Sequence, residues 1–123
     1  MAAVAGDEPV IVPDAVLSGF LRIVTGSRVF QIAEPMADAL GFLRQLLRAP
    51  AVSIGHAGAG HWDVFSGLCE RTGVRAGLVS DAFLAAMAIE VGATLVTFDG
   101  DFARFPGLTW RHTLGGQTLT NPG

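Results

Sequence analysis

The stretch LVSDAFLAAMAIEVGATLVTFDGDFARFPGLTWRH, residues 78–112, holds the signals that decide the fold. Within it residues 82–89 are apolar on every side, Ser80 or Asp81 is placed to cap a helix, and Gly92 is placed to end it. A helix without a polar face must be covered on both sides, which is typical of a helix packed against a parallel sheet.

Two strands are predicted after this helix. Residues 94–98 form a β-branched and aromatic run of strand length, and residues 108–110 have the pattern of a short final strand. Strands separated by helices imply right-handed crossovers in an open sheet, where sites gather just beyond the carboxyl ends of the strands. Asp99 directly follows the first of these two strands and is therefore expected at such a position.

The chain before residue 78 predicts the same alternation of strands and helices. Residues 10–12 are an apolar run closed by Pro13, and Asp14 is expected to cap the helix that follows. Apolar residues of this helix recur at i, i+3, i+4 and i+7, which predicts one buried face. They are Leu17, Phe20, Leu21 and Val24.

Two more helices and one strand complete the pattern. A helix is expected to open near Pro35, a strand to cover residues 52–54, and a third helix to stop at Gly73. The side chains expected to point inward are Met36, Leu40, Leu43 and Leu47 in the second helix and Trp62, Phe65, Leu68 and Cys69 in the third. The sequence therefore predicts an α/β fold with a mostly parallel sheet flanked by helices.

The composition is that of one globular domain covering residues 1–123. Half of the residues are hydrophobic and 15% are charged, which is far from the profile of a disordered chain. The net charge of −3 excludes a general basic field for nucleic acid or membrane, although all eight basic residues are arginine. The single cysteine indicates a reducing compartment.

Nothing in the sequence predicts a secretory signal or a membrane span. The first residues carry no positive charge before their apolar positions, and acidic residues and prolines follow early. The apolar run of residues 82–89 is far shorter than the roughly 18 residues that a spanning helix needs. We therefore expect a cytoplasmic protein without membrane contact.

The residues Phe98-Asp99-Gly100-Asp101-Phe102 have two interpretations. Asp-Gly is a common two-residue hairpin turn, and the spacing alone slightly favours this structure. Alternatively, Asp99 and Asp101 supply hard oxygen ligands for Mg²⁺ or Mn²⁺. Asp81 strengthens the second interpretation as a third acid that leads into the same sheet edge, although an acid at a helix start is stabilising without any metal.

These residues also carry a family resemblance. Ser80–Ala86 followed by Gly92–Leu108 resembles the C-terminal half of the PIN-domain ribonucleases, and more narrowly the VapC toxins of toxin–antitoxin pairs. Val12–Thr25, with Arg28–Phe30 after it, is similar to an actinobacterial-style branch of the same family. The resemblance covers nearly the whole chain and is most specific at its two ends.

The resemblance implies a PIN-like three-layer sandwich and a Mg²⁺-dependent endoribonuclease toxin of a type II toxin–antitoxin system, with Mn²⁺ as an alternative ion. In the family, four acids bind one or two divalent ions and hydrolyse RNA phosphodiesters. The third acid falls on Asp81 and the fourth on Asp99, with Asp101 as an outer or alternate ligand. The implied partners are an RNA substrate, a cognate antitoxin that occupies the acidic site, and a second copy of the chain.

The sequence departs from the family pattern in two places. The family's first acid lies at the end of an N-terminal strand that has no counterpart here, so we expect an N-terminally incomplete PIN domain without its first strand. The second acid falls on Gly19, and a glycine inside a helix needs a reason, for which close packing and drift are the two alternatives. Asp14 and Glu34 are the nearest acids, and the pattern assigns neither of them a ligand role.

Other functions have less support. These two departures favour an inactive PIN remnant that retains only antitoxin binding or self-association. A receiver-like signalling domain with Asp99 as phosphate acceptor lacks the lysine which that class requires, since the chain contains none. His56, His61 and His112 have no metal-binding spacing, so we expect surface or hydrogen-bonded core roles for them.

Overall fold

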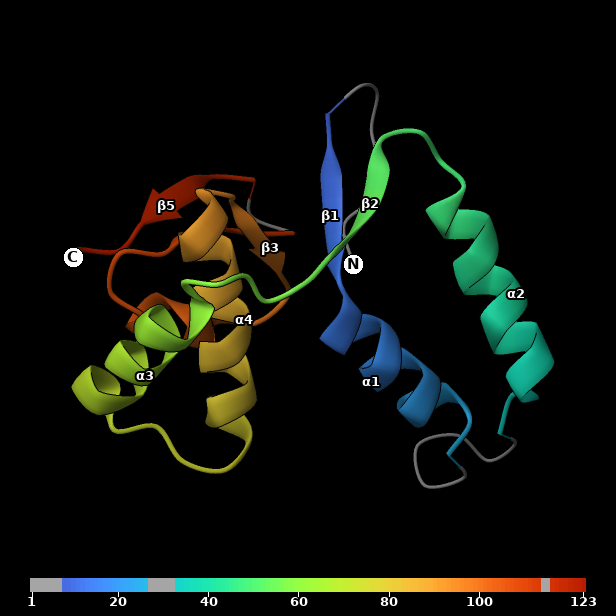
Figure 1. Ribbon diagram of the computed structural model, residues 1–123, viewed down its shortest axis with the longest axis horizontal. Helices are drawn as coiled ribbons and strands as arrows, with labels where there is room; N and C mark the ends of the chain where they lie inside the picture. Colours follow the sequence, from blue (N-terminus) through green and yellow to red (C-terminus); the bar gives the residue numbers. More distant parts are fainter. Residues whose placement is uncertain (1–7, 27–32, 114–115) are drawn as a thin grey trace. The chain divides into compact units, whose positions relative to one another are not determined.

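The computed structural model describes residues 8–26, 33–113 and 116–123, so the Arg28–Phe30 part of the family pattern lies outside the described residues. The chain forms two compact units that divide between His56 and Ala57. Each unit contains helices and a parallel strand pair (Figure 1). The predicted α/β class is therefore confirmed, with the described strands arranged in two separate ladders.

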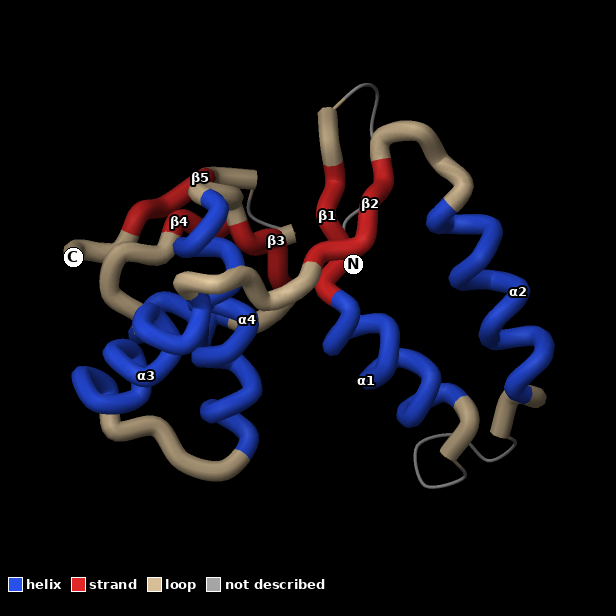
Figure 2. The backbone as a smooth tube through the Cα atoms, in the orientation of Figure 1, coloured by secondary structure: helices blue, strands red, loops and turns tan. Residues whose placement is uncertain are grey.

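The first unit is a βααβ arrangement. Its elements are β1 (Val10–Pro13), α1 (Asp14–Val24), α2 (Met36–Leu47) and β2 (Val52–Gly55). The two strands pair in parallel, with Val10 opposite Val52 and Pro13 opposite Gly55 (Figure 2). Parallel neighbours need a long crossover connection, and the two helices provide it.

Two side chains of the first unit differ from the sequence expectation. Leu43 is buried as predicted, but Met36 is 49% exposed because it is the first residue of α2 and its side chain leans past the end of the helix. Asp14 is the first residue of α1 rather than its cap, because the extended residue at the N-cap position is Pro13. The Asp14 charge still favours the positive end of the helix.

The second unit carries the stretch that opened the sequence analysis. Its elements are α3 (His61–Thr72), α4 (Gly77–Val91), β3 (Leu95–Thr97), the 3-10 helix η1 (Gly100–Arg104), β4 (Thr109–His112) and β5 (Thr118–Thr120). β3 and β4 pair in parallel, whereas β4 and β5 pair antiparallel. The sequence predicted β3 and β4, whereas no strand was predicted at the residues of β5.

The core of the second unit forms around α4. Ala82, Ala85 and Ala86 are fully buried and pack with Leu68 of α3 and with Trp110 of β4. The small alanine side chains allow neighbouring elements to approach the helix closely on several sides. This burial explains why α4 has no polar face, as the sequence predicted.

The buried face of α3 is set by a histidine. His61 is only 4% exposed, its Nε2 lies 3.0 Å from the carbonyl oxygen of Phe83, and its ring stacks on Phe65. The expected core role of His61 is thus confirmed. Trp62, which was expected to point inward, is 68% exposed because the buried face runs through positions 61, 65 and 68.

Glu90 of α4 fixes the loop that leads into α3. Its Oε1 accepts a hydrogen bond from the backbone N–H of Gly58 at 3.0 Å, and its Oε2 accepts one from Gly60 at 2.9 Å. α3 has no side-chain cap from its own N-cap residue, so this carboxylate supplies acceptors near the helix start. A side chain at Gly58 would place its Cβ only 2.6 Å from Oε2 of Glu90.

In the described part of the chain, the helices are all too short or too polar to span a membrane.

Gly19 lies inside α1, where close packing was one expected reason for a glycine. No described atom lies within 4 Å of the position that a Cβ would take there, so the expected close packing is absent. We predict that Gly19→Ala raises the free energy of unfolding by about 0.5–1 kcal/mol, because alanine restricts the unfolded chain at no steric cost. Urea denaturation measures the change.

Gly92→Ala is the matched control for this substitution. Gly92 ends α4 at a φ of 68°, where a Cβ is strained, so the same change should lower the free energy of unfolding by about 1 kcal/mol. A destabilised Gly19→Ala variant would contradict the open space seen at position 19.

Candidate metal centre

Asp81 lies inside α4 and not at its start. The helix begins at Gly77, so the expectation that Ser80 or Asp81 caps it is wrong. The sequence signal was misleading because the residue at the N-cap position is Ala76, a poor cap residue, whereas Ser80 and Asp81 are good ones. A capping role therefore does not explain an acid at position 81.

Asp99 is held at the carboxyl end of β3, where the sequence predicted it. It is the N-cap residue of η1, and its Oδ1 accepts a hydrogen bond from the backbone N–H of Asp101 at 2.8 Å. Its own N–H donates to Oγ1 of Thr97 at 3.1 Å. Side-chain and backbone contacts thus fix Asp99 on both sides.

The Asp-Gly pair at residues 99–100 does not form a two-residue hairpin. β3 and β4 run parallel, and the connection between them passes through η1. A two-residue hairpin joins only antiparallel strands, so the turn interpretation fails on topology. The two acids of this segment instead flank the first residue of a short helix.

Asp101 is exposed and lies beside a cation. Its Oδ1 is 3.5 Å from Nη2 of Arg104, and Nε of Arg104 donates to the Asp101 carbonyl oxygen at 3.0 Å. The guanidinium and carboxylate are both well exposed, so this ion pair contributes little to stability. It does place one positive charge within the acidic segment.

The three acids interact electrostatically. The pKa of Asp81 is raised above its ordinary value, first by partial burial and then by the negative charges of Asp99 and Asp101, while Arg104 opposes the rise. Charges influence a pKa in this way only when they lie near the group. The pKa of Asp81 is thus the observation that links this residue to the two acids after β3.

Carboxylates suit a hard divalent cation. Mg²⁺ commonly binds proteins through one or two carboxylates and keeps several waters, so Asp81 and Asp99 fit its donor preference. Among the described residues no group of three or more acidic, histidine or cysteine side chains is assembled closely enough to hold a metal ion. An ion bound by Asp81 and Asp99 would therefore need water for most of its remaining ligands.

One pair of polar residues escaped the sequence analysis. Nδ1 of His56 lies 2.9 Å from Oδ2 of Asp14, and this hydrogen bond holds the pKa of Asp14 below its ordinary value. Each residue directly follows one of the parallel strands β1 and β2. That shared position is the signal that could have found the pair. Both side chains are largely exposed, which agrees with the surface role expected for His56.

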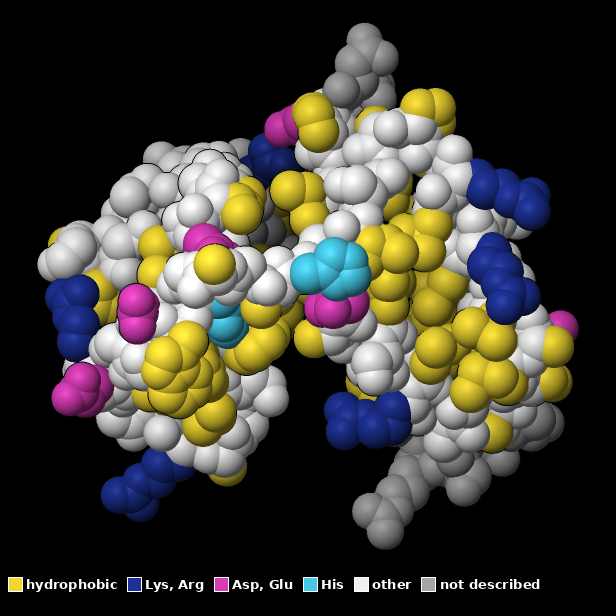
Figure 3. Space-filling view, in the orientation of Figure 1, with side chains coloured by type: hydrophobic (Ala, Val, Ile, Leu, Met, Phe, Trp, Pro, Cys, Tyr) yellow, Lys and Arg dark blue, Asp and Glu magenta, His cyan; other side chains and the backbone are white. Residues whose placement is uncertain are grey.

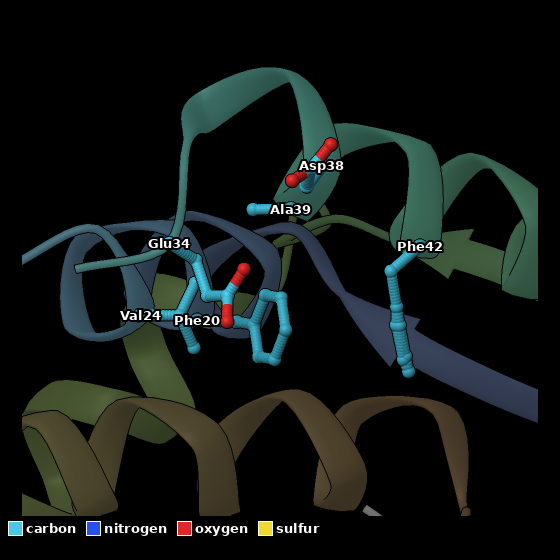
Figure 4. A pocket seen from close by; sticks show the side chains of 6 residues that line it. All are labelled: Phe20, Val24, Glu34, Asp38, Ala39 and Phe42. Atoms are coloured by element: carbon cyan, nitrogen blue, oxygen red, sulfur yellow. The ribbon is translucent and has the colours of Figure 1, made fainter. Parts of the chain in front are cut away.

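A pocket of about 210 Å³ opens between α1 and α2. Phe20, Val24, Glu34, Asp38, Ala39 and Phe42 line it (Figure 4). Hydrophobic side chains are also exposed over these two helices (Figure 3), among them Ile23, Met36 and Phe42. The lining offers an apolar surface with two carboxylates and no nucleophile, which suits binding better than chemistry.

Comparisons with known proteins agree with the sequence resemblance. The model of the PIN domain matches residues 1–108. VapC ribonuclease Mb2897 of Mycobacterium bovis is 44% identical over 112 residues, which are 91% of this chain and 76% of that protein. Ribonuclease VapC33 of Mycobacterium tuberculosis is 42% identical over 80% of this chain and 68% of its own length.

A solved structure has a similar fold. The crystal structure of VapBC2 from Rickettsia felis bound to a DNA fragment from their promoter matches with a TM-score of 0.65. The match has 23% sequence identity and covers 85% of this chain and 74% of that one. Together with the family match and the acids beyond β3, these relatives show that the chain belongs to the PIN-domain family and, within it, to the VapC ribonucleases.

Proposed function

We propose that this chain is a Mg²⁺-dependent endoribonuclease toxin of a type II toxin–antitoxin system, which hydrolyses RNA phosphodiesters at the acidic centre. Its membership of the VapC ribonucleases supports the reaction. The observation that carries the assignment is that Asp99 and Asp101 lie just beyond the carboxyl end of β3, with Asp99 held by the Asp101 N–H, and that their charges raise the pKa of Asp81. Mn²⁺ is the alternative ion.

Asp81 gains no stability from its position beside the other two acids. Asp81 caps no helix, and the neighbouring carboxylates disfavour its ionised form. A cation would relieve this repulsion, which is why crowded carboxylates are typical of metal sites. The cost in the metal-free chain supports a functional reason for the arrangement.

Asp81 and Asp99 are the residues that would hold the ion, and Asp101 is an outer or alternate ligand. A bound divalent ion supplies an activated water at neutral pH and polarises a phosphoryl oxygen. The protein positions its carboxylates by building Asp81 into a buried helix and by fixing Asp99 with the Asp101 N–H. No histidine base or covalent nucleophile is needed.

The surface beside Asp99 suits a nucleic acid. Phe98 is 62% exposed and directly precedes Asp99, so its ring offers a face on which a base can stack. Arg104 adds a guanidinium that can contact a phosphate once the nearby carboxylates hold a cation. These two residues supply local RNA contacts in a chain with no general basic field.

The remaining features of the proposal concern partners and organisation. We propose a cognate antitoxin that occupies the acidic site, a second copy of the chain, and a cytoplasmic location. The match of the PIN model to residues 1–108 supports treating the two compact units as parts of one domain.

The second candidate function is an inactive PIN remnant that retains antitoxin binding or self-association. The pocket of α1 and α2 and its exposed hydrophobic side chains favour it, because such surfaces mark protein contacts. Gly19 also favours it, since this glycine stands where the family pattern has an acid. Activity measurements separate the two candidates.

We predict RNA cleavage that requires Mn²⁺ or Mg²⁺ and falls about 100-fold or more in Asp81→Asn and Asp99→Asn, because each change removes a charge that would hold the ion. Cleavage of a mixed RNA pool, followed by gel electrophoresis with and without a chelator, measures it. Asp63→Asn is the matched control, since Asp63 is an exposed acid on α3. Equal cleavage by all variants would contradict the metal-site assignment. No cleavage by the unchanged chain, with or without added metal ions, would favour the inactive remnant.

We also predict that Asp81→Asn raises the melting temperature of the metal-free chain at neutral pH by up to about 4 °C. The folded-state pKa of Asp81 lies above its ordinary value of 3.8, so its ionised form is disfavoured by folding. The penalty is full at neutral pH and disappears as the pH falls through the folded-state pKa toward 3.8.

Differential scanning calorimetry at pH 7 and near pH 4 measures this difference. The gap between the two proteins should narrow at the lower pH and at high salt, which screens the repulsion. A variant that melts below the unchanged chain at pH 7 would show that Asp81 is stabilising and not strained.

A further inference from the structure

Asn121, the residue directly after β5, uses its whole side-chain amide in hydrogen bonds. Its Oδ1 accepts from Nε1 of Trp110 at 3.0 Å, and its Nδ2 donates to the carbonyl oxygens of Phe102 at 2.9 Å and Phe105 at 2.8 Å. Reversing the amide would set donor against donor and acceptor against acceptor, so the network fixes its orientation. All three bonds are partly buried.

The backbone of Asn121 is tied down as well. Its N–H donates to the carbonyl oxygen of Leu108 at 2.9 Å, and its own carbonyl accepts from the N–H of Gly107 at 3.2 Å. β5 lies antiparallel to β4 just before it (Figure 2). Side-chain and backbone hydrogen bonds therefore both attach Asn121 to the part of the chain that runs from η1 to β4.

The Asn121 hydrogen bonds hold the C-terminal end of η1. Phe102 lies within η1 and Phe105 is its C-cap residue, and both rings are buried. The near end of η1 is fixed by the side chain of Asp99, which accepts from the Asp101 N–H. A single turn of 3-10 helix is not stable alone, so its geometry depends on contacts at both ends.

We propose that Asn121 is a positioning residue for the acidic centre, holding η1 so that the carboxylates of Asp99 and Asp101 stay near Asp81. Asn121 touches no carboxylate and acts only through the carbonyl groups of Phe102 and Phe105. This inference rests on the proposed function, in which the acidic centre binds a divalent metal ion. The C-terminal strand β5, which the sequence did not predict, then becomes part of the support of the site.

The expected effect follows from how metal sites depend on their supports. Residues that orient ligands without touching the metal typically change metal affinity by 10–100-fold when they are replaced. Asn121→Asp keeps the size of the side chain and an acceptor for Trp110, but it places an oxygen against two carbonyl oxygens. Asn121→Ala removes all three bonds without that repulsion and is the second variant.

Trp110→Phe is the matched control. It removes the indole bond to Asn121 and disturbs the same core, since Trp110 is only 6% exposed, but it leaves both carbonyl bonds of the amide in place. If Asn121 has only a structural role, the control and an Asn121 variant that lower the melting temperature equally should also change the metal affinity equally. A positioning role predicts different effects on metal affinity.

The test measures Mn²⁺ binding to the full chain without RNA, by electron paramagnetic resonance, together with hydrogen exchange of the Asp101 N–H. We expect a dissociation constant for Mn²⁺ that rises about 10-fold in the Asn121 variants and less than about 2-fold in Trp110→Phe. The Asp101 N–H should exchange faster in the Asn121 variants, even without metal, because its bond to Asp99 depends on the geometry of η1.

Three results would overturn the inference, and one of them also overturns the proposed function. Unchanged Mn²⁺ affinity in an Asn121 variant that circular dichroism shows to be folded overturns the inference while the proposed function stands. Mn²⁺ binding in the unchanged chain that equals that of Asp99→Asn overturns the proposed function and the inference with it. An affinity loss in Trp110→Phe as large as that in Asn121→Asp likewise overturns the positioning role.

Discussion

The second unit depends on the burial of α4. A helix whose side chains are nearly all apolar has no stable exposed face. Helix α3, strand β4 and the segment that joins β3 to β4 must therefore all pack around it. This burial fixes the position of Asp81, because the residue belongs to the same rigid helix. The two acids of the helix lie toward its opposite ends: the charges of Asp99 and Asp101 raise the pKa of Asp81, and Glu90 holds the loop before α3.

The sequence predicts the strands and helices well where a physical pattern is local. The end of α4 at Gly92 and the end of α3 at Gly73 follow from the left-handed backbone that glycine tolerates. β1, β2, β3 and β4 follow from short apolar and β-branched runs between helices. The start of α4 was predicted too late because good capping residues lie inside the helix, and burial overrides that local preference.

The candidate site was predictable only in part. Asp99 follows from its place after a strand, and Asp81 and Asp101 were grouped with it by spacing and family resemblance. The resemblance, and not the spacing, favoured a metal over a hairpin turn, and the parallel pairing of β3 with β4 then removed the hairpin. The pair formed by Asp14 and His56 leaves only a weak sequence signal, its position directly after two strands, because 42 residues separate its members and strand register brings them together.

β5 shows why the rest of the structure lies beyond local patterns. Its residues Thr118–Thr120 are all exposed and present no apolar face, so neither periodicity nor burial selects a strand there. The strand forms because β4 offers a free edge for pairing. The amide of Asn121 also accepts one hydrogen bond from an indole N–H and donates two to carbonyl oxygens. These partners belong to η1, its C-cap residue and β4, so the last strand depends on tertiary contacts. A support of this kind leaves no periodic signal in the sequence, and the acidic segment that it holds is therefore easier to predict than the residues that keep it in place.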